Sequence, residues 1–233
     1  MKNPRRIHLS DEMLVEHGLS KESPPPDALF WTMWNACANV AQEALETAFI
    51  QGIRGGTLDP VHYGGFNVSD AFYCFHGAED YSTAARRADD RTLRAFLLAK
   101  HHGYQKYNES FPSTWRIRDA SSIVPLDVCR EYSAFERRVV SQEDPIYSLV
   151  VMLPCEYLWA WLAAQLSPAQ PQNLYAAWIT GNDDPGSAYA MGNFLESYRA
   201  QHPVDQEKAI QIYCRAMTFE QENFTAALEA AST

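Results

Sequence analysis

The segment that most restricts the fold is SLVVMLPCEYLWAWL, residues 148–162, an apolar run that carries Pro154 directly before Cys155. With its flanks it predicts a buried helix over about residues 144–166, because every side of such a helix is apolar. A proline inside a helix donates no N–H and clashes with the carbonyl four residues earlier, here that of Val150, which costs about 3 kcal/mol. We therefore expect a kink that turns the Cys155 sulfur toward a cavity. Most buried thiols are inert, and these residues alone leave that alternative open.

The rest of the chain shows no sustained alternation of apolar and polar residues, so strands are not expected. The first helix should begin at Asp27 as its N-cap and end at Gly55 and Gly56, and Pro60 suits the first turn of the next helix. Besides the helix around Cys155, the expected helices cover about residues 27–55, 60–88, 91–108, 125–140, 171–200 with a break at TGNDDPGS, and 204–230. The sequence thus predicts an all-α fold of about seven helices, which forms one domain over residues 27–233.

The N-terminal segment is different in composition. Residues 1–26 end in KESPPPD, and three consecutive prolines favour an extended polyproline conformation. We expect an arm that lies on the surface or is partly disordered. Its first part, MKNPRRIHLSDEMLVEHG, has no apolar signal core, and Pro154 and Glu156 interrupt the longest apolar run. Neither a secretion signal nor a membrane span is therefore expected.

Charge and cysteine usage restrict the partners. The 233 residues include 29 acidic and 19 basic side chains, a formal net charge of -10. Such a surface repels phosphate backbones and anionic lipids, so we expect no nucleic acid and no membrane as partner. The five cysteines are scattered and form no CxxC pair. This pattern argues against a zinc knuckle or a disulfide framework and favours reduced thiols in the cytoplasm.

Four motifs resemble, in order along the chain, those of the TenA family, the class II thiaminases and aminopyrimidine hydrolases. The stretch FIQGIRGGTLDPVHYGGFNVSDAFYCF resembles the family's F-V-x-G-I-x-x-G-T-L followed by a helix with Q-D-x-x-Y, and LPCEYLWAWL resembles its LPC-x-W-x-Y. YAAWI resembles Y-x-x-W-I, and FEQENFTAAL resembles E-x-x-F-[FW]-x-x-A. The resemblance covers about residues 28–229. It implies a heme-oxygenase-like helical bundle, usually tetrameric, with no metal or organic cofactor and with a small pyrimidine as its ligand. We expect a homo-oligomer, a dimer or a tetramer.

The resemblance also implies roles for single residues. Cys155 matches the nucleophile that attacks the pyrimidine ring, and Glu220 matches the glutamate that hydrogen-bonds the ring nitrogen as general acid and base. Asp70 matches the aspartate that accepts hydrogen bonds from an exocyclic amine, and Tyr73 lies three residues further on the same helix face. The remaining substrate-binding candidates are Tyr132, Tyr175, Trp159 and Asn223.

Each of these roles has a plain structural alternative. Glu220 would otherwise be a solvated charge on the last helix, where Glu222 competes for the same match. Asp70 would otherwise cap or pair at a helix surface, yet it stands within FNVSDAFYCF, where an unpaired charge is costly to bury. We therefore expect it to meet a ligand amine or a tyrosine hydroxyl. For Tyr132 and Tyr175, simple core packing is an equal alternative.

Several positions depart from the family pattern. Ser69 stands where the family has the glutamine before its aspartate, and Asn223 stands where an aromatic ring packs on the pyrimidine. Asn182 and Trp159 replace two tyrosines. The cysteine and glutamate chemistry is thus retained, while the walls that select the substrate are altered.

Three functions remain open at this point. The first is an aminopyrimidine hydrolase of the thiaminase II type, linked to thiamin salvage. The second is a non-catalytic pyrimidine-binding or regulatory protein, which the altered walls favour. The third is a di-iron oxidase on the same fold. The last helix contains no histidine, so His76, Glu79, His101 and His102 remain as its candidate ligands, and solvent-facing histidines are the alternative.

Overall fold

The computed structural model describes residues 20–229, and these residues form helices without any strand. The helices are α2 (Leu29–Ala36), α3 (Ala38–Glu46), α4 (Ala48–Gly55), α5 (Pro60–Arg87), α6 (Arg91–Asn108), α7 (Phe111–Thr114), the 3-10 turn η1 (Ala120–Ser122), α8 (Asp127–Gln142), α9 (Tyr147–Leu166), α10 (Ala176–Asn182), α11 (Gly186–Arg199) and α12 (Gln206–Glu229). The predicted all-α fold is confirmed for this part of the chain.

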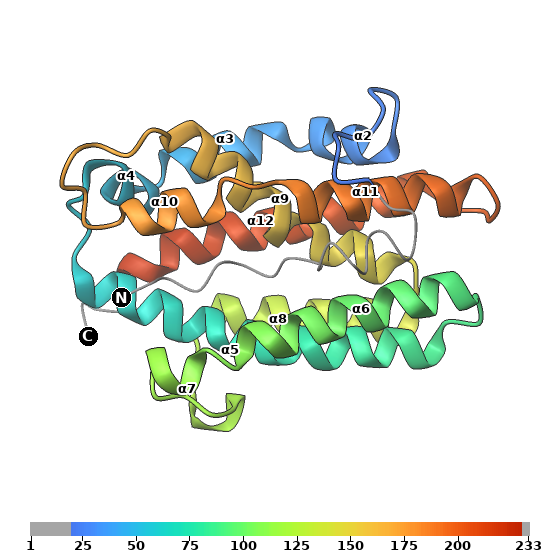
Figure 1. Ribbon diagram of the computed structural model, residues 1–233, viewed down its shortest axis with the longest axis horizontal. Helices are drawn as coiled ribbons and strands as arrows, with labels where there is room; N and C mark the ends of the chain where they lie inside the picture. Colours follow the sequence, from blue (N-terminus) through green and yellow to red (C-terminus); the bar gives the residue numbers. More distant parts are fainter. Residues whose placement is uncertain (1–19, 230–233) are drawn as a thin grey trace.

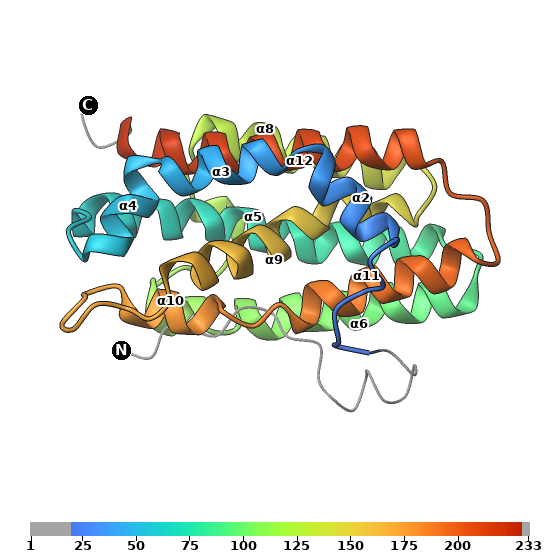
Figure 2. The ribbon, with the colours of Figure 1, turned by 90° about the horizontal axis from the view of Figure 1, so that it is seen from above.

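Helix α9 runs through the middle of an elongated bundle (Figures 1 and 2), and in the view of Figure 1 α2, α3 and α4 lie on one side of it and α5, α6 and α8 on the other. Helix α9 packs against α3, α5, α8, α10, α11 and α12, so it has neighbours all around. An apolar helix is stable in such a place because it exposes no face to water. This position brings the middle of α9 next to the inner faces of α5, α8 and α12.

The buried helix predicted around Cys155 is confirmed. Helix α9 continues through Pro154, and only Glu156, Trp161 and two residues of its last turn are less than fully buried. By length and composition α9 is apolar enough to cross a membrane, although 83% of its most apolar window is covered by the rest of the bundle. Its place in the fold is that of a core helix.

The single helix predicted over residues 27–55 is wrong, because the chain bends at Cys37 and Thr47 and divides it into α2, α3 and α4. Thr47 leaves the helical conformation and its hydroxyl accepts a hydrogen bond from the Ile50 amide at 3.4 Å, as an N-cap does. The three short helices wrap around α12. A capping side chain favours the end of a helix over its continuation. The contacts of the three short helices with α12 also favour this division.

The predicted N-cap of the first helix is also wrong. Ala28, and not Asp27, is the N-cap residue of α2, and it has no capping side chain of its own. Instead Glu196, on α11, accepts a hydrogen bond from the Leu29 amide at 2.5 Å. A carboxylate from a distant helix thus satisfies a free donor at the start of α2, which local sequence cannot reveal.

The other predicted boundaries agree with the structure more closely. Gly56 ends α4 in the left-handed conformation, with φ 68°, which glycine adopts without strain. Pro60 is the first residue of α5, and Asp59 caps it by accepting from the Val61 amide at 2.8 Å. The break at TGNDDPGS separates α10 from α11, where Asp184 accepts from the Gly186 amide at 2.8 Å.

Of the predicted arm, residues 1–19 lie outside the described residues. Residues 20–26 lie extended on the bundle. The Asn193 amide donates to the carbonyls of Ser20 and Glu22, each at 2.9 Å, and the Trp31 indole donates to that of Pro24 at 3.0 Å. The end of the arm is therefore fastened to α11 and α2.

Candidate active site

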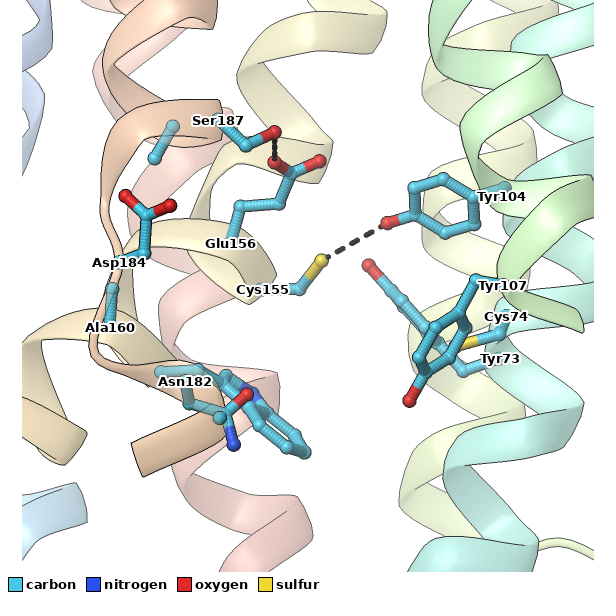
Figure 3. A pocket seen from close by; sticks show the side chains of 13 residues that line it. Tyr73, Cys74, Tyr104, Tyr107, Cys155, Glu156, Ala160, Asn182, Asp184 and Ser187 are labelled. Carbon is cyan, nitrogen blue, oxygen red and sulfur yellow. Dashed lines mark hydrogen bonds between the residues drawn. The ribbon is translucent and has the colours of Figure 1, made fainter. Parts of the chain in front are cut away.

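A cavity opens beside Cys155 between α5, α6, α9 and the α10–α11 connection (Figure 3). Its walls combine aromatic rings, a thiol and a few polar groups, as small-molecule sites do. The lining residues are Tyr73, Cys74, Tyr104, Tyr107, Cys155, Glu156, Trp159, Ala160, Gly181, Asn182, Asp184, Ser187 and Ala188. Three of the predicted site residues, Cys155, Tyr73 and Trp159, are among them.

The Cys155 sulfur faces two tyrosine hydroxyls. The Tyr104 hydroxyl lies 3.3 Å from the sulfur, within hydrogen-bond distance, and the Tyr73 hydroxyl points toward the same place (Figure 3). Burial is the main cause that raises the pKa of both tyrosines, and the negative charge of a Cys155 thiolate adds to it. Both hydroxyls therefore keep their hydrogens, and that of Tyr104 can donate to the sulfur.

Behind Tyr73 stands a carboxyl group that the sequence reading did not single out. The Tyr73 hydroxyl donates to Oε1 of Glu136, on α8, at 2.5 Å. The Glu136 side chain is fully buried, and burial raises its pKa well above the usual value for glutamate. A carboxyl of this kind exchanges its proton in a higher pH range than an exposed one.

Glu220 is buried on the other side of the cavity wall. It is 4% exposed, so the alternative of a solvated surface charge does not apply to it. Its Oε2 accepts a hydrogen bond from the Trp159 indole at 3.0 Å. The charges of Glu220, Glu136 and Cys155 all raise the pKa of Tyr132, after burial itself, which shows that these groups surround its phenol.

Asp70 is buried near the same groups, at 8% exposure, but it does not line the cavity. Its Oδ2 accepts a weak hydrogen bond from the Cys74 sulfur at 3.9 Å. Its charge also contributes to raising the pKa of Cys129 to about 12, although burial is the larger cause. Asp70 thus lies on the inner side of α5, one turn of helix from a residue of the cavity wall.

Tyr132, Tyr175 and Asn223 do not line the cavity. The Tyr132 ring stacks on Phe219, with the centroids 5.3 Å apart, and the buried Oδ1 of Asn223 has no hydrogen-bond partner in the part of the chain that the structure describes. The Tyr175 hydroxyl donates to the carbonyl of Leu58 at 2.5 Å. Their part in substrate binding stays a prediction, and for Tyr175 the structure shows a packing role.

Two of the residues that depart from the family pattern have structural partners. The Ser69 hydroxyl accepts from the Leu126 amide at 3.1 Å, and so holds the start of α8 against α5. The Asn182 amide donates to the Trp178 carbonyl at 2.7 Å and lines the cavity. Ser69 therefore supports the wall from behind, while Asn182 is in a position to contact a ligand.

A second polar cluster lies beside Cys155, on the side of the cavity away from Tyr73 and Tyr104 (Figure 3). Lys100 on α6 is fully buried and forms an ion pair with Oε1 of Glu156. Its ammonium also donates to the Ser187 hydroxyl at 3.2 Å, and that hydroxyl donates to Oε2 of Glu156 at 2.5 Å (Figure 3). Each of the three groups thus has two partners within the cluster, which ties α6, α9 and α11 together.

The residues considered for a di-iron centre do not gather. Within residues 20–229, no three histidine, cysteine, aspartate or glutamate side chains lie close enough to hold one metal ion. His76 pairs with Glu79 and Arg137, and the His101 ring nitrogen Nδ1 lies 2.7 Å from the Ala78 carbonyl. The donor set that such a centre needs is therefore missing from this part of the chain.

Sequence reasoning missed Tyr104, Tyr107, Lys100 and Glu136. The first three were detectable, because Lys100, Tyr104 and Tyr107 recur at helical spacing on one face of α6. Glu136 follows Tyr132 by four residues, on the buried face of α8. A charged residue on an apolar face was the signal that could have identified it.

Solved structures of other proteins share this fold. The structure superposes on a TenA homologue from P. horikoshii OT3 with a TM-score of 0.74, at 16% identity, over 87% of this chain and 99% of that one. A TenA homologue from Pyrococcus furiosus gives a TM-score of 0.74 at 13% identity, over 85% and 99% of the two chains. The chain has the TenA fold. The TenA-like, heme-oxygenase-like bundle implied by the sequence motifs is thereby confirmed.

Two further comparisons mention thiamin chemistry. A TenA-like thiaminase structure from Sulfolobus solfataricus P2 matches with a TM-score of 0.68 at 13% identity, over 85% of this chain and 96% of that one. The thiamine biosynthesis multifunctional protein ThiED of Corynebacterium efficiens is 22% identical over 200 residues, 82% of this chain. The aligned region spans 27% of that relative's length. No protein-family model matches the sequence.

Proposed function

We propose that this TenA-like protein hydrolyses an aminopyrimidine related to thiamin, with Cys155 as the nucleophile and Glu220 as the general acid and base. The observation that carries the proposal is the Cys155 sulfur in the cavity wall, with a buried Glu220 held behind that wall by Trp159. The thiamin-related names of the relative and of the fold neighbour support it.

The chemistry divides between the two residues. Protonation of a ring nitrogen by Glu220 makes the pyrimidine electrophilic, and the Cys155 thiolate then adds to the ring carbon. The leaving amine departs with a proton, and water releases the pyrimidine from sulfur. Because the Trp159 indole now occupies Glu220, the proposal requires this indole to move away when a pyrimidine binds. Asp70 and Tyr73 are proposed to bind the substituents of the ring.

The direct test is turnover of thiamin and of aminomethyl-pyrimidine by the wild type and by Cys155→Ala. We expect the substitution to lower turnover by about 10³-fold or more, as loss of a nucleophile does. Cys214→Ala is the matched control, because Cys214 is a partly exposed cysteine of α12 that does not line the cavity. Equal turnover by wild type and Cys155→Ala would exclude the proposed nucleophile.

A non-catalytic pyrimidine-binding protein is the second candidate. It is favoured by the position of Asp70 and Glu220, neither of which lines the cavity in this structure. Tight pyrimidine binding without turnover, unchanged by Cys155→Ser, would support it over the hydrolase. Isothermal titration with aminomethyl-pyrimidine, combined with the turnover assay, distinguishes the two.

Assembly and location are proposed on the same basis. A homo-oligomer, dimer or tetramer, located in the cytoplasm and without a metal or organic cofactor is consistent with the TenA-like fold. Light scattering measures the oligomeric state directly.

A further inference from the structure

Tyr104 brings a hydroxyl to the Cys155 sulfur from a part of the chain that no family motif covers. Its oxygen lies 3.3 Å from the sulfur, within hydrogen-bond distance, and its side chain lines the cavity. Tyr104 stands on α6, whereas the motifs that resemble the TenA family lie on α4, α5, α9, α10 and α12. The resemblance therefore assigns no role to this contact with the thiol.

The space for the Tyr104 ring comes from Gly77 on α5. A Cβ at Gly77 would lie 2.8 Å from Cε1 of Tyr104, closer than two carbon atoms pack. Glycine inside a helix lowers its stability relative to alanine, so a glycine at this place calls for a reason. The Tyr81 ring meets Tyr104 edge-on, with the centroids 5.2 Å apart, and Tyr104 is 1% exposed. Gly77 and Tyr81 together hold the ring where its hydroxyl reaches the sulfur.

The direction of this hydrogen bond depends on the charge of the sulfur. A neutral thiol can donate to the phenol or accept from it, but a thiolate has no hydrogen and can only accept. Burial is the main cause that raises the pKa of Tyr104, and the charge of a Cys155 thiolate adds to it, so the phenol keeps its hydrogen beside an ionised sulfur. Tyr73 donates its own hydrogen to Glu136. Tyr104 is therefore the tyrosine that is placed to donate to the thiolate.

The charges around Cys155 do not favour a thiolate. The titratable and charged side chains that line the cavity, interact electrostatically with Cys155 or surround those groups are Asp70, Tyr73, Cys74 and Tyr81 on α5, Lys100, Tyr104 and Tyr107 on α6, Tyr132 and Glu136 on α8, Glu156 on α9, Asp184 between α10 and α11, and Glu220 on α12. Lys100 is the cation of this set, and it is paired with Glu156. An ionised carboxylate opposes a thiolate, and a protonated carboxyl group carries no charge that attracts one. Because burial opposes ionisation as well, a hydrogen bond to the sulfur is the influence that favours the thiolate.

We propose that the Tyr104 hydroxyl donates a hydrogen bond to the ionised Cys155 sulfur and so favours the thiolate that attacks the substrate, with Gly77 as the residue that positions the Tyr104 ring. A hydrogen bond to a charged acceptor is stronger than one to a neutral acceptor, so the thiolate gains more from it than the thiol does. Tyr104 keeps its hydrogen, and in the free protein the thiol hydrogen leaves to solvent. The inference rests on the function proposed above, to which it adds a catalytic residue and a positioning residue.

The test is the pH dependence of Cys155 alkylation by iodoacetamide in the native protein, measured by mass spectrometry of the Cys155 peptide. We expect Tyr104→Phe, which removes the hydroxyl and keeps the ring, to raise the midpoint of the profile by about one pH unit. The midpoint reports the ionisation of the sulfur and does not depend on how easily the reagent enters the cavity. An unchanged midpoint in Tyr104→Phe overturns the inference.

Tyr107→Phe is the matched control for the loss of a phenol. Tyr107 lines the same cavity and lies three residues after Tyr104 on α6, but its hydroxyl points away from the Cys155 sulfur (Figure 3). We therefore expect Tyr107→Phe to keep the wild-type midpoint. An equal shift in Tyr107→Phe and Tyr104→Phe would show that the direct contact with the sulfur is not the cause, and would also reject the inference.

Gly77→Ala tests the positioning role. It should raise the midpoint in the wild-type background and leave it unchanged in Tyr104→Phe, where no hydroxyl remains to be displaced. A shift of equal size in both backgrounds, or none in the wild-type background, rejects Gly77 as the positioning residue. Circular dichroism shows whether each variant is folded, and Gly77→Ala keeps the test valid if Tyr104→Phe is not.

The alkylation assay does not depend on turnover, so the inference and the proposed function can fail separately. A raised midpoint in Tyr104→Phe without any pyrimidine hydrolysis by the wild type supports the hydrogen bond and rejects the hydrolase. Cys155-dependent hydrolysis with an unchanged midpoint in Tyr104→Phe does the reverse.

Discussion

Glu156 and Glu136 are two glutamates near the same cavity, with side chains 6% and 0% exposed, and their partners differ completely. Glu156 pairs with the fully buried Lys100 and accepts from Ser187, so both of its oxygens are occupied. Glu136 has Tyr73 on one oxygen and, among residues 20–229, no hydrogen-bond partner on the other. A carboxylate neutralised by a buried cation holds its charge and fastens helices together, whereas one without a cation is driven to bind a proton. The first arrangement is structural, and the second is available for chemistry.

The largest expected effect concerns the paired glutamate. Lys100→Met leaves Glu156 buried without its cation, and we expect a loss of about 3–5 kcal/mol in the free energy of unfolding. Adding Glu156→Leu should recover most of this loss, because the unpaired charge is then removed. Urea denaturation of the single and double variants measures both effects.

Lys208→Met is the matched control for that experiment. Lys208 pairs with Glu143 at 2.7 Å, but the two side chains are 43% and 35% exposed. An ion pair open to solvent contributes little to stability, so we expect a much smaller loss in Lys208→Met than in Lys100→Met. Equal losses in Lys100→Met and Lys208→Met would contradict the structural role of the buried pair.

The second prediction concerns the proton-binding carboxyls between α5 and α8. Burial, the largest cause, raises the pKa of Asp80 from 3.8 to about 6 against the attraction of Arg137. The folded state therefore keeps a proton that the unfolded state has released, and the free energy of unfolding should fall as pH rises from about 4 to 6, by about 3 kcal/mol. Asp80→Asn should remove the Asp80 part of this fall, as measured by urea denaturation at several pH values.

The Glu136→Gln variant distinguishes the contribution of Glu136 from that of Asp80. Burial raises the pKa of Glu136 from 4.5, so the sign is the same as for Asp80, and the free energy of unfolding falls as pH rises above about 4.5. This part of the fall should persist in Asp80→Asn and disappear in Glu136→Gln. A pH dependence that is identical in wild type and Glu136→Gln would show that Glu136 does not bind a proton more tightly in the folded state.

The smallest expected effect tests the packing that places Tyr104 at the thiol. A Cβ at Gly77 would lie 2.8 Å from Cε1 of Tyr104, whose ring is buried, so the ring would have to shift. We expect Gly77→Ala to cost about 1–2 kcal/mol and to displace the Tyr104 hydroxyl from Cys155. Gly64 lies on the same helix with no atom within 4 Å of such a Cβ, so Gly64→Ala should stabilise by up to about 1 kcal/mol. Thermal unfolding of the two variants checks the contrast.

Local patterns predicted most of the helices and the family resemblance. The apolar run predicted the core helix α9, and Pro60 and the TGNDDPGS break lie where the structure starts or interrupts a helix. The predictions of helix boundaries failed where a residue far away in the sequence determines the local structure. Glu196 caps α2 across the bundle, and packing on α12 divides the first predicted helix into three. Such groups are more than a hundred residues away in sequence, so no local rule could reveal them.

The same division applies to the site. The sequence by itself determined which chemical groups are present, a thiol after a proline in a buried helix and carboxyls within apolar helices, because helical periodicity places them on inner faces. Only the tertiary structure decided which of them meet. It placed Glu220 against Trp159, and it gave Glu156 a cation and Glu136 a tyrosine. The physical reason is that the protonation state of a buried carboxyl group depends on the groups around it. These groups lie on neighbouring helices, and only helix packing brings them within hydrogen-bond distance.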